Sequence, residues 1–307
     1  MMILSLVALL STAPATDVYR IDMPGPGDYE SWAVDHEYDP AESGPIIITA
    51  QGENGSSVQT WPSPETLDSN GDGKFSVVAH YPKALGTVTY TIAVGEQATT
   101  YRPVIYQQQN RYILPLAGNT IVSRGLFNQN GHGWYTSRFA YDFLGLDKTY
   151  APMTAPEYSN ANLAGFGMPV IAPADGVVVF VEDRLPDQEG EYDAESFRLP
   201  DGSQAYHGNT VIIDHGKGEF VALMHLKQGS IRVAVGDHVV QGQPVGALGN
   251  SGDSSGPHLH VQLQAGPLPQ GFPSLPLTFA DHGDQILESG DYLTYRPVNN
   301  ESRPPSE

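Results

Sequence analysis

Apolar and polar residues alternate along short stretches of this chain, and glycine or proline separates most of these stretches. In residues 87–94 every second side chain is apolar, which is the period of a strand with one buried face. Residues 46–49 and 75–80 are similar short runs that favour strands. We therefore predict a small all-β domain, built as a sandwich, in the first part of the chain.

A second set of strand-like runs follows Ile121, where the runs are longer and the glycines more regularly spaced. These runs are residues 169–181, 210–214, 220–225 and 259–263. Turns that contain glycine separate them. No stretch shows the 3.6-residue apolar period of a helix. We predict that the whole chain is all-β.

The first residues resemble an export signal. An apolar run from Met2 to Leu10 precedes Ala13 and Ala15, which fit the small-x-small cleavage pattern. This run is too short to span a bilayer, so we expect a secreted or periplasmic mature chain without membrane insertion. An uncleaved hydrophobic terminus or a buried first strand is the alternative. The predicted parts are a signal peptide (1–15), an accessory domain (16–118), a second domain (119–275) and a loose tail (276–307).

The amino-acid composition excludes several classes of function and of metal site. The chain holds 35 acidic against 15 basic residues, a net charge of -20, which argues against a nucleic-acid partner or an anionic membrane surface. The absence of cysteine excludes disulfides, thiolate metal sites and cysteine nucleophiles. Any metal must therefore be held by histidines and carboxylates.

Two histidines have a geometry that suggests chemistry. On a strand, His258 and His260 would project from one face, where they could share a metal or divide metal binding and proton transfer. Asp142 is a lone carboxylate among aromatic residues, and a cation would offset the cost of burying it. His132 lies in a glycine-rich loop that could return to the same place. A His, Asp, His set leaves a fourth zinc position for water, as in catalytic sites.

Residues 221–263 carry several motifs in a fixed order. They begin with a His-Leu pair and a Val-x-x-Gly-Asp-x-Val-x-x-Gly-Gln turn pair, and they end with Gly-Asn-Ser-Gly and Pro-His-Leu-His. An Ala-Pro-x-x-Gly motif precedes them in residues 169–179. This arrangement resembles the lysostaphin-type, or LytM-type, zinc endopeptidases that cut peptidoglycan crosslinks. The resemblance covers about half of the chain and implies an all-β core of antiparallel sheets with a groove across it.

The resemblance also implies roles for particular residues. The family's zinc ligands fall on Asp142 and His260, and its catalytic histidines on His225 and His258. The family commonly has a further ligand histidine four residues before the aspartate, but that position is Arg138 here. Some members place this histidine farther upstream, so the resemblance assigns the first ligand to His132, in the glycine-rich loop.

The implied function is hydrolysis of peptidoglycan peptides by a zinc-activated water, carried out by a chain that we expect to be a monomer. A non-enzymatic LytM-like activator of wall hydrolases and a protease acting on non-wall proteins are the alternatives. The sequence leaves open the cleaved bond, the roles of the two catalytic histidines and the task of the accessory domain.

Three other motifs favour turns over chemistry. Ser254 lies in a Gly-x-Ser-x-Gly pattern of serine hydrolases, but no helix is expected after it. Lys227 lacks the setting of a lipoyl or biotin carrier lysine. Residues 68–73 match the start of a calcium loop, yet Ala79 occupies the position of its bidentate glutamate.

Overall fold

The structure is a computed structural model that describes most of the chain after the predicted signal peptide. The described residues are 16–22, 29–38, 46–51, 60–61, 74–82, 88–95, 97–125, 132, 136–189, 192–199 and 201–295. They belong to two compact units, Met1–Gln107 with Gly133–Arg138 and Gln108–His132 with Phe139–Glu307. The predicted signal peptide and the calcium-loop motif lie outside the described residues. Across the described part, no helix is long and apolar enough to cross a membrane.

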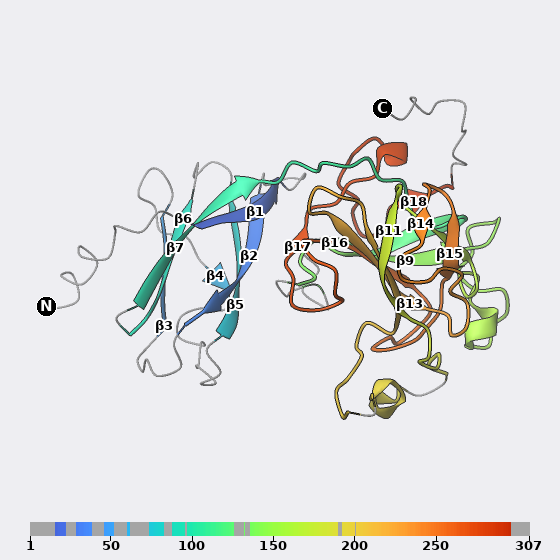
Figure 1. Ribbon diagram of the computed structural model, residues 1–307. Helices are drawn as coiled ribbons and strands as arrows, with labels where there is room; N and C mark the ends of the chain where they lie inside the picture. The colour runs from blue at the N-terminus through green and yellow to red at the C-terminus, as the bar shows by residue number, and fades with distance from the viewer. Residues whose placement is uncertain are drawn as a thin grey trace, which may run out of the picture. The chain divides into compact units, whose positions relative to one another are not determined.

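The first unit is a seven-stranded sheet (Figure 1). Its strands are β1 (Thr16–Asp22), β2 (Tyr29–Glu37), β3 (Ile46–Gln51), β4 (Thr60–Trp61), β5 (Lys74–Pro82), β6 (Thr89–Val94) and β7 (Gln97–Ile105). Their order is β3-β6-β7-β1-β2-β5-β4. Only the β1–β7 pair is parallel among these described strands. Alternate residues of β6 are buried, as its apolar period predicts.

Two strands of this unit were not expected. Residues 16–44 are rich in proline, glycine and acidic residues and suggest an irregular lead-in, but the structure places β1 and β2 there. The prolines and glycines are concentrated in residues 24–27, between the two strands. The strands themselves are too polar for their pattern to be noticed, and pairing with β5 and β7 stabilises them.

The second unit is built on a nine-stranded sheet. Its strands are β8 (Asn119–Arg124), β9 (Tyr141–Leu146), β11 (Gly176–Glu182), β12 (Asn209–Asp214), β13 (Phe220–Leu226), β14 (His238–Val239), β16 (Leu259–Gln264), β17 (Ser274–Leu275) and β18 (Tyr292–Leu293). The order is β14-β11-β12-β13-β16-β9-β8-β18, and β17 pairs with β16. Every described pair is antiparallel. The predicted antiparallel, all-β fold of this part is confirmed.

The run 169–181, predicted as one strand candidate, forms two strands in different sheets. β10 (Pro169–Ile171) pairs with β15 (Pro244–Ala247), whereas β11 joins the large sheet. Between them lies Ala-Pro-Ala-Asp, and its proline cannot donate a ladder hydrogen bond. The Ala-Pro-x-x-Gly motif is therefore the point at which the chain changes sheets.

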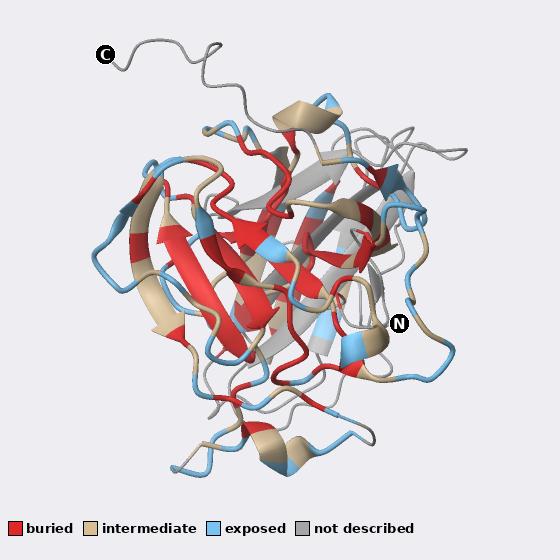
Figure 2. Ribbon diagram, turned by 90° about the vertical axis from the view of Figure 1, so that its right-hand side faces the viewer, coloured by how far each residue is buried: buried red, intermediate tan, exposed pale blue. Residues whose placement is uncertain are grey.

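The core of the second unit follows the central strands. All six residues of β16 are buried, as are six of the seven residues of β13. Figure 2 shows buried residues in continuous runs along neighbouring strands, while exposed residues lie mostly in the connecting loops. The described residues contain no α-helix, only three short 3-10 helices, η4 (Asn160–Asn162), η5 (Ala194–Phe197) and η6 (Ala280–His282).

Residues 276–295 are packed into the second unit instead of forming the expected loose tail. Leu277 and Phe279 are fully buried, and the Phe279 ring contacts the rings of Tyr141 and Phe143 on β9. β18 then pairs with β8 at the sheet edge. The apolar residues are too widely spaced in this segment for the sequence pattern to show that they are buried.

Candidate metal centre

Adjacent strands bring the predicted ligands together in the second unit. β16 lies between β13 and β9, and its register places His260 directly beside Asp142 of β9. A directly opposite pair on an antiparallel ladder has its side chains on the same face. This register therefore joins two residues that are 118 positions apart in the sequence.

His132 completes a cluster with these two residues. Its Nε2 lies 3.2 Å from Asp142 Oδ1, and His260 Nδ1 lies 3.0 Å from the same oxygen. The potential ligand atoms of the three side chains all lie within 4.8 Å of one another. All three residues are buried. The structure thus brings His132, rather than Arg138, into the cluster of potential ligands; Arg138 falls in the other unit.

The electrostatics of the cluster favour an ionised aspartate and neutral imidazole. Burial alone would raise the pKa of Asp142, but the neighbouring imidazoles of His258, His132 and His260 hold it well below its usual value. Burial lowers the pKa of His132, against the opposing effect of Asp142. Deprotonated carboxylate and neutral imidazole are the forms that bind metal ions.

A chain of buried glutamines determines the protonation of His260. His260 Nε2 donates to Gln262 Oε1 at 2.9 Å, and Gln262 Nε2 donates to Gln264 Oε1 at 2.6 Å. Gln264 Nε2 in turn donates to backbone carbonyls. The hydrogen of a neutral His260 ring is thereby placed on Nε2, so its Nδ1 lone pair faces Asp142 Oδ1.

These glutamines were missed at the level of sequence. Gln262 and Gln264 follow His260 at every second position of β16, so all three side chains share one face. The pattern His-x-Gln-x-Gln on a strand was the available signal. Polar residues at consecutive same-face positions of a buried strand require hydrogen-bond partners, and here they find one another.

The predicted catalytic histidines lie beside the cluster. The ring centroids of His225 and His258 are 4.6 Å apart. His225 Nδ1 donates to the Ser251 carbonyl and His258 Nδ1 donates to the Gly256 carbonyl, both at 2.8 Å. With Nδ1 committed as a donor, Nε2 is the nitrogen of each ring that is left to accept a proton. His258 Nε2 lies 3.7 Å from Asp142 Oδ1.

The backbone of β13 is irregular where it carries His225. The β12–β13 register shifts between Asn209 and Val211, and His225 has a φ of +59°. A bulge of this kind re-aims a side chain, and a left-handed non-glycine residue is uncommon. Burial, followed by the charges of His258 and His260, lowers the pKa of His225 well below its usual value. The ring is therefore neutral at pH 7.

The Gly-Asn-Ser-Gly motif supports this arrangement. Ser251 Oγ donates to the Leu226 carbonyl and accepts from Asn209 N, which fixes the carbonyl that holds His225. Ser254 Oγ donates to Asn250 Oδ1 at 2.6 Å and lies 3.2 Å from His258 Nδ1. Ser254 is buried and followed by a strand, so the structure offers no strand-to-helix nucleophile elbow there.

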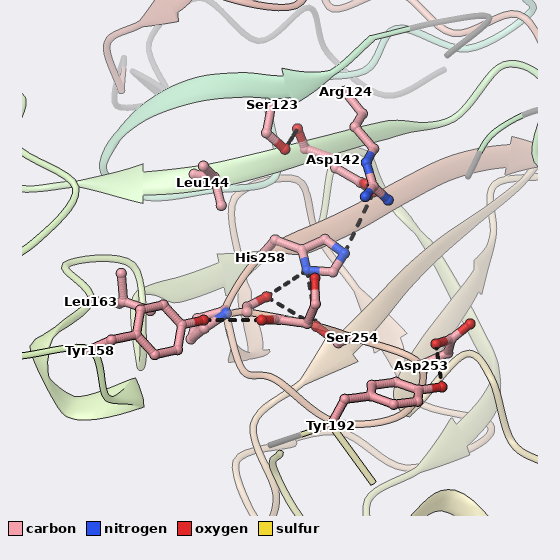
Figure 3. Close-up of a pocket in the computed structure, with 13 residues that line it drawn as sticks. Ser123, Arg124, Asp142, Leu144, Tyr158, Leu163, Tyr192, Asp253, Ser254 and His258 are labelled. Carbon is pink, nitrogen blue, oxygen red and sulfur yellow. Dashed lines mark hydrogen bonds and ion pairs between the residues drawn. The ribbon is translucent and has the colours of Figure 1, made fainter. Parts of the chain in front are cut away.

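A cavity of about 550 Å³ opens beside the cluster. Figure 3 shows His258 at its centre, Arg124 and Asp142 on one side, and Asp253 with Tyr192 on the other. Tyr192 lies in the segment that connects β11 to β12. Arg124 was not singled out from the sequence, because an arginine at a strand end is ordinarily a solvated surface residue.

Part of the chain that carries this cluster is similar to a known family of peptidases. The model of peptidase family M23 matches residues 161–270. This stretch of the chain is therefore similar to the members of peptidase family M23. The match includes His225, His258 and His260, while Asp142 and His132 precede it.

Curated relatives with a similar sequence are named as peptidases, and one name includes peptidoglycan. The peptidoglycan DD-endopeptidase ShyA of Vibrio cholerae is 34% identical over 97 residues, which are 32% of this chain and 17% of that protein. The DD-carboxypeptidase/endopeptidase Mpg of Neisseria meningitidis is 28% identical over 176 residues, 53% of this chain and 34% of the relative. The chain thus spans no more than about a third of the length of either relative.

Solved structures are similar at low identity. The catalytic domain of lysostaphin from Staphylococcus simulans has 20% identity and a TM-score of 0.31, covering 50% of this chain and 86% of that chain. A zinc-containing peptidase from Vibrio cholerae has 15% identity and a TM-score of 0.32, covering 80% and 81%.

Proposed function

We propose that this chain is a zinc metalloendopeptidase that hydrolyses peptide crosslinks of peptidoglycan in the cell envelope. One observation carries the proposal. The Nδ1 lone pair of His260 faces an ionised carboxylate oxygen at 3.0 Å, in a buried cluster beside two histidines whose Nε2 atoms accept protons. Two facing lone pairs repel each other unless a cation lies between them.

The residues fit a zinc ion. Donor atoms at zinc–ligand distances of 2.0–2.1 Å and tetrahedral angles are about 3.3 Å apart. The His132–Asp142 and His260–Asp142 distances of 3.2 and 3.0 Å are close to this edge length. His132, Asp142 and His260 would hold the ion. Two imidazoles and one carboxylate suit zinc and leave a fourth position, and such a set would also accept cobalt or manganese.

The ion, when bound, would supply Lewis-acid polarisation of a peptide carbonyl and lower the pKa of a water molecule. The chain's own contribution comes from His225 and His258. Each Nε2 can take up a proton as the water attacks, because each Nδ1 hydrogen is committed to a backbone carbonyl. Once protonated, the same nitrogen can donate to the developing oxyanion or to the leaving amine. His258 lines the cavity, where it can meet the substrate directly.

Peptidoglycan is proposed as the substrate because the relative from Vibrio cholerae is named a peptidoglycan DD-endopeptidase. The predicted export signal supports the same compartment. We propose residues 16–118 as an accessory domain, residues 119–275 as the catalytic domain and a monomer as the working form. A net charge of -20 does not favour electrostatic attachment to anionic wall polymers, so wall peptides are the partner that we expect.

Digestion of purified peptidoglycan tests the proposal. The chain is incubated with wall material, with and without a chelator, and released fragments are identified by mass spectrometry. We expect fragments with new peptide termini that disappear with the chelator and return when zinc is added. Absence of release by protein shown to carry zinc would contradict the proposal and favour a wall-hydrolase activator or a protease for non-wall proteins.

A further inference from the structure

An arginine stands beside the candidate metal centre. Arg124 ends β8, and its register partner on β9 is Asp142. Its Nη1 lies 3.5 Å from Asp142 Oδ2, the carboxylate oxygen that faces away from the two histidine ligands. Among the described residues this is the only polar contact of the guanidinium, and the side chain is 42% exposed. Most of its donors therefore remain available to a ligand.

The cavity gives this arginine a particular setting. Arg124 is the only lysine or arginine among the described residues that line it. The other charged group apart from Asp142 is Asp253, which already accepts a hydrogen bond from Tyr192 at 2.8 Å. In Figure 3 Arg124 and Asp253 lie on opposite sides of His258. One wall of the cavity thus presents a single cation, in a chain whose net charge is strongly negative.

We propose that Arg124 binds the free α-carboxylate of the substrate residue whose amine leaves in hydrolysis. The proposal rests on the proposed function and adds a substrate requirement to it. That carboxylate is attached to the Cα next to the scissile nitrogen, within about one residue length, 3.8 Å, of the reacting carbonyl. Arg124 lies close to this position, because its Nη1 is 3.5 Å from the carboxylate of a proposed metal ligand.

The geometry distinguishes this role from simple charge balance for Asp142. An arginine engaged with a carboxylate for stability makes short, often bidentate contacts of about 2.7–2.9 Å. The Arg124 contact is longer and single, and the side chain is half exposed in the cavity. A guanidinium in this state can hold a second carboxylate through its planar pair of N–H donors.

Two short peptides test the requirement. One is acetylated and ends in D-alanyl-D-alanine with a free carboxylate, following the DD-linkage in the relatives' names, and the other is its C-terminal amide. For the zinc-loaded wild type, we expect kcat/KM to be about 10- to 100-fold higher for the free carboxylate, the range of a hydrogen-bonded charge. Arg124→Gln should bring the two values within about threefold, and Arg124→Lys should retain part of the preference.

The controls separate recognition from metal binding. Arg198→Gln removes a cation of similar exposure, 43%, that pairs with Glu195 outside the cavity lining, and it should keep the wild-type preference. Zinc content of Arg124→Gln should equal that of the wild type. Absence of a preference in the wild type, loss of zinc from Arg124→Gln, or an equal fall in rate for both peptides would overturn the proposal.

A binding measurement keeps this test independent of the proposed hydrolysis. If the zinc-loaded wild type cleaves neither peptide, the proposed function fails for this linkage, and calorimetry with the same peptides still decides the role of Arg124. We expect the free-carboxylate peptide to bind the wild type at least about tenfold more tightly than it binds Arg124→Gln. Equal affinity of both proteins for that peptide would contradict the proposal.

Discussion

In three histidines of the site, one ring nitrogen donates a hydrogen bond. The position of this bond determines which nitrogen is left to accept a proton or to bind a metal ion. His225 and His258 give their Nδ1 hydrogens to backbone carbonyls, whereas His260 gives its Nε2 hydrogen to Gln262. The Nε2 atoms of the first two rings are left to accept protons, and His260 presents Nδ1 to Asp142. Residues of one type thus divide into two proposed proton carriers and one proposed metal ligand.

Alanine substitutions should separate these roles. His225→Ala and His258→Ala each remove a proton acceptor without removing a proposed ligand. We expect both variants to keep their zinc while kcat falls by about a hundredfold or more. Metal analysis and steady-state kinetics on released peptide measure the two quantities. The exposed His238→Ala is the control, and zinc loss from His225→Ala would contradict the assignment.

Gln262 should influence metal affinity without touching the metal. Gln262→Leu removes the acceptor of His260 Nε2, so the orientation and tautomer of the ligand ring are no longer fixed. We expect zinc affinity to fall by about 10- to 100-fold, as measured by competition with a chelator. Gln262→Glu supplies an acceptor again and should recover most of the loss. An unchanged zinc affinity in Gln262→Leu would show that the hydrogen-bonded glutamines fill space without orienting the ligand ring.

Among single residues, the sequence predicts those site residues that regular strand geometry brings to one face. His258 and His260 follow from the two-residue period, and Asp142 from its aromatic surroundings. The carbonyls of Ser251 and Gly256 could not be predicted, since backbone groups carry no sequence signal. Arg124, His132 and Asp142 come together through strand register and loop conformation, which pattern alone does not give.

At the scale of elements, the site depends on a close contact between the loop before β12 and the Gly-Asn-Ser-Gly turn. Gly208 precedes β12 with a φ of +63°, and a Cβ added there would overlap the Ser251 carbonyl. That carbonyl holds His225 in its left-handed position at the end of β13. The loop before β12 and the Gly-Asn-Ser-Gly turn therefore position the His225 ring jointly.

Gly208→Ala should displace the Ser251 carbonyl and with it His225. We expect kcat to fall at least about tenfold and the free energy of unfolding to fall by 1–3 kcal/mol, roughly the cost of overpacking plus strain. Gly202→Ala is the matched control, because Gly202 also has a positive φ, +87°, but an added Cβ there meets nothing within 4 Å. Equal losses of activity in both variants would mean that backbone strain alone is responsible.

Strands were predictable where apolar residues alternate or run together, as in β6, β12 and β16. The prediction failed for strands that form because they pair with a neighbouring strand and not because their own residues alternate between apolar and polar. β1 and β2 are polar strands that are defined by their neighbours. β18 has only two residues and exists because β8 offers an edge. The break between β10 and β11 near a proline could not be located from the sequence, because it depends on the two strands pairing in different sheets.

At the scale of the whole molecule, buried neutral histidines couple stability to pH. Burial lowers the pKa of His207 to about 4, with its ring against Phe180. The unfolded chain binds a proton at this residue below about pH 6.5, whereas the folded chain does so only near pH 4. The stabilisation by His207 is thus complete above pH 6.5 and is lost as the pH falls through this interval.

We expect the free energy of unfolding to drop by about 3 kcal/mol between pH 6.5 and 4 from His207 alone. Burial also lowers the pKa of His36 and His215, which adds to the same trend. Urea unfolding at a series of pH values measures the slope. His207→Phe should flatten it, whereas His238→Phe at an exposed position should leave it unchanged. A slope that His207→Phe does not alter would contradict this explanation.

The zinc content of four purified chains tests the central claim most directly. The wild type should hold one zinc ion per chain. Asp142→Ala and His132→Ala should hold none after dialysis against a weak chelator, and Arg138→Ala should hold the wild-type amount. Failure of the wild type to bind zinc, or retention of zinc by Asp142→Ala, would contradict the account. Loss from Arg138→Ala with retention by His132→Ala would show that the first ligand is wrongly assigned.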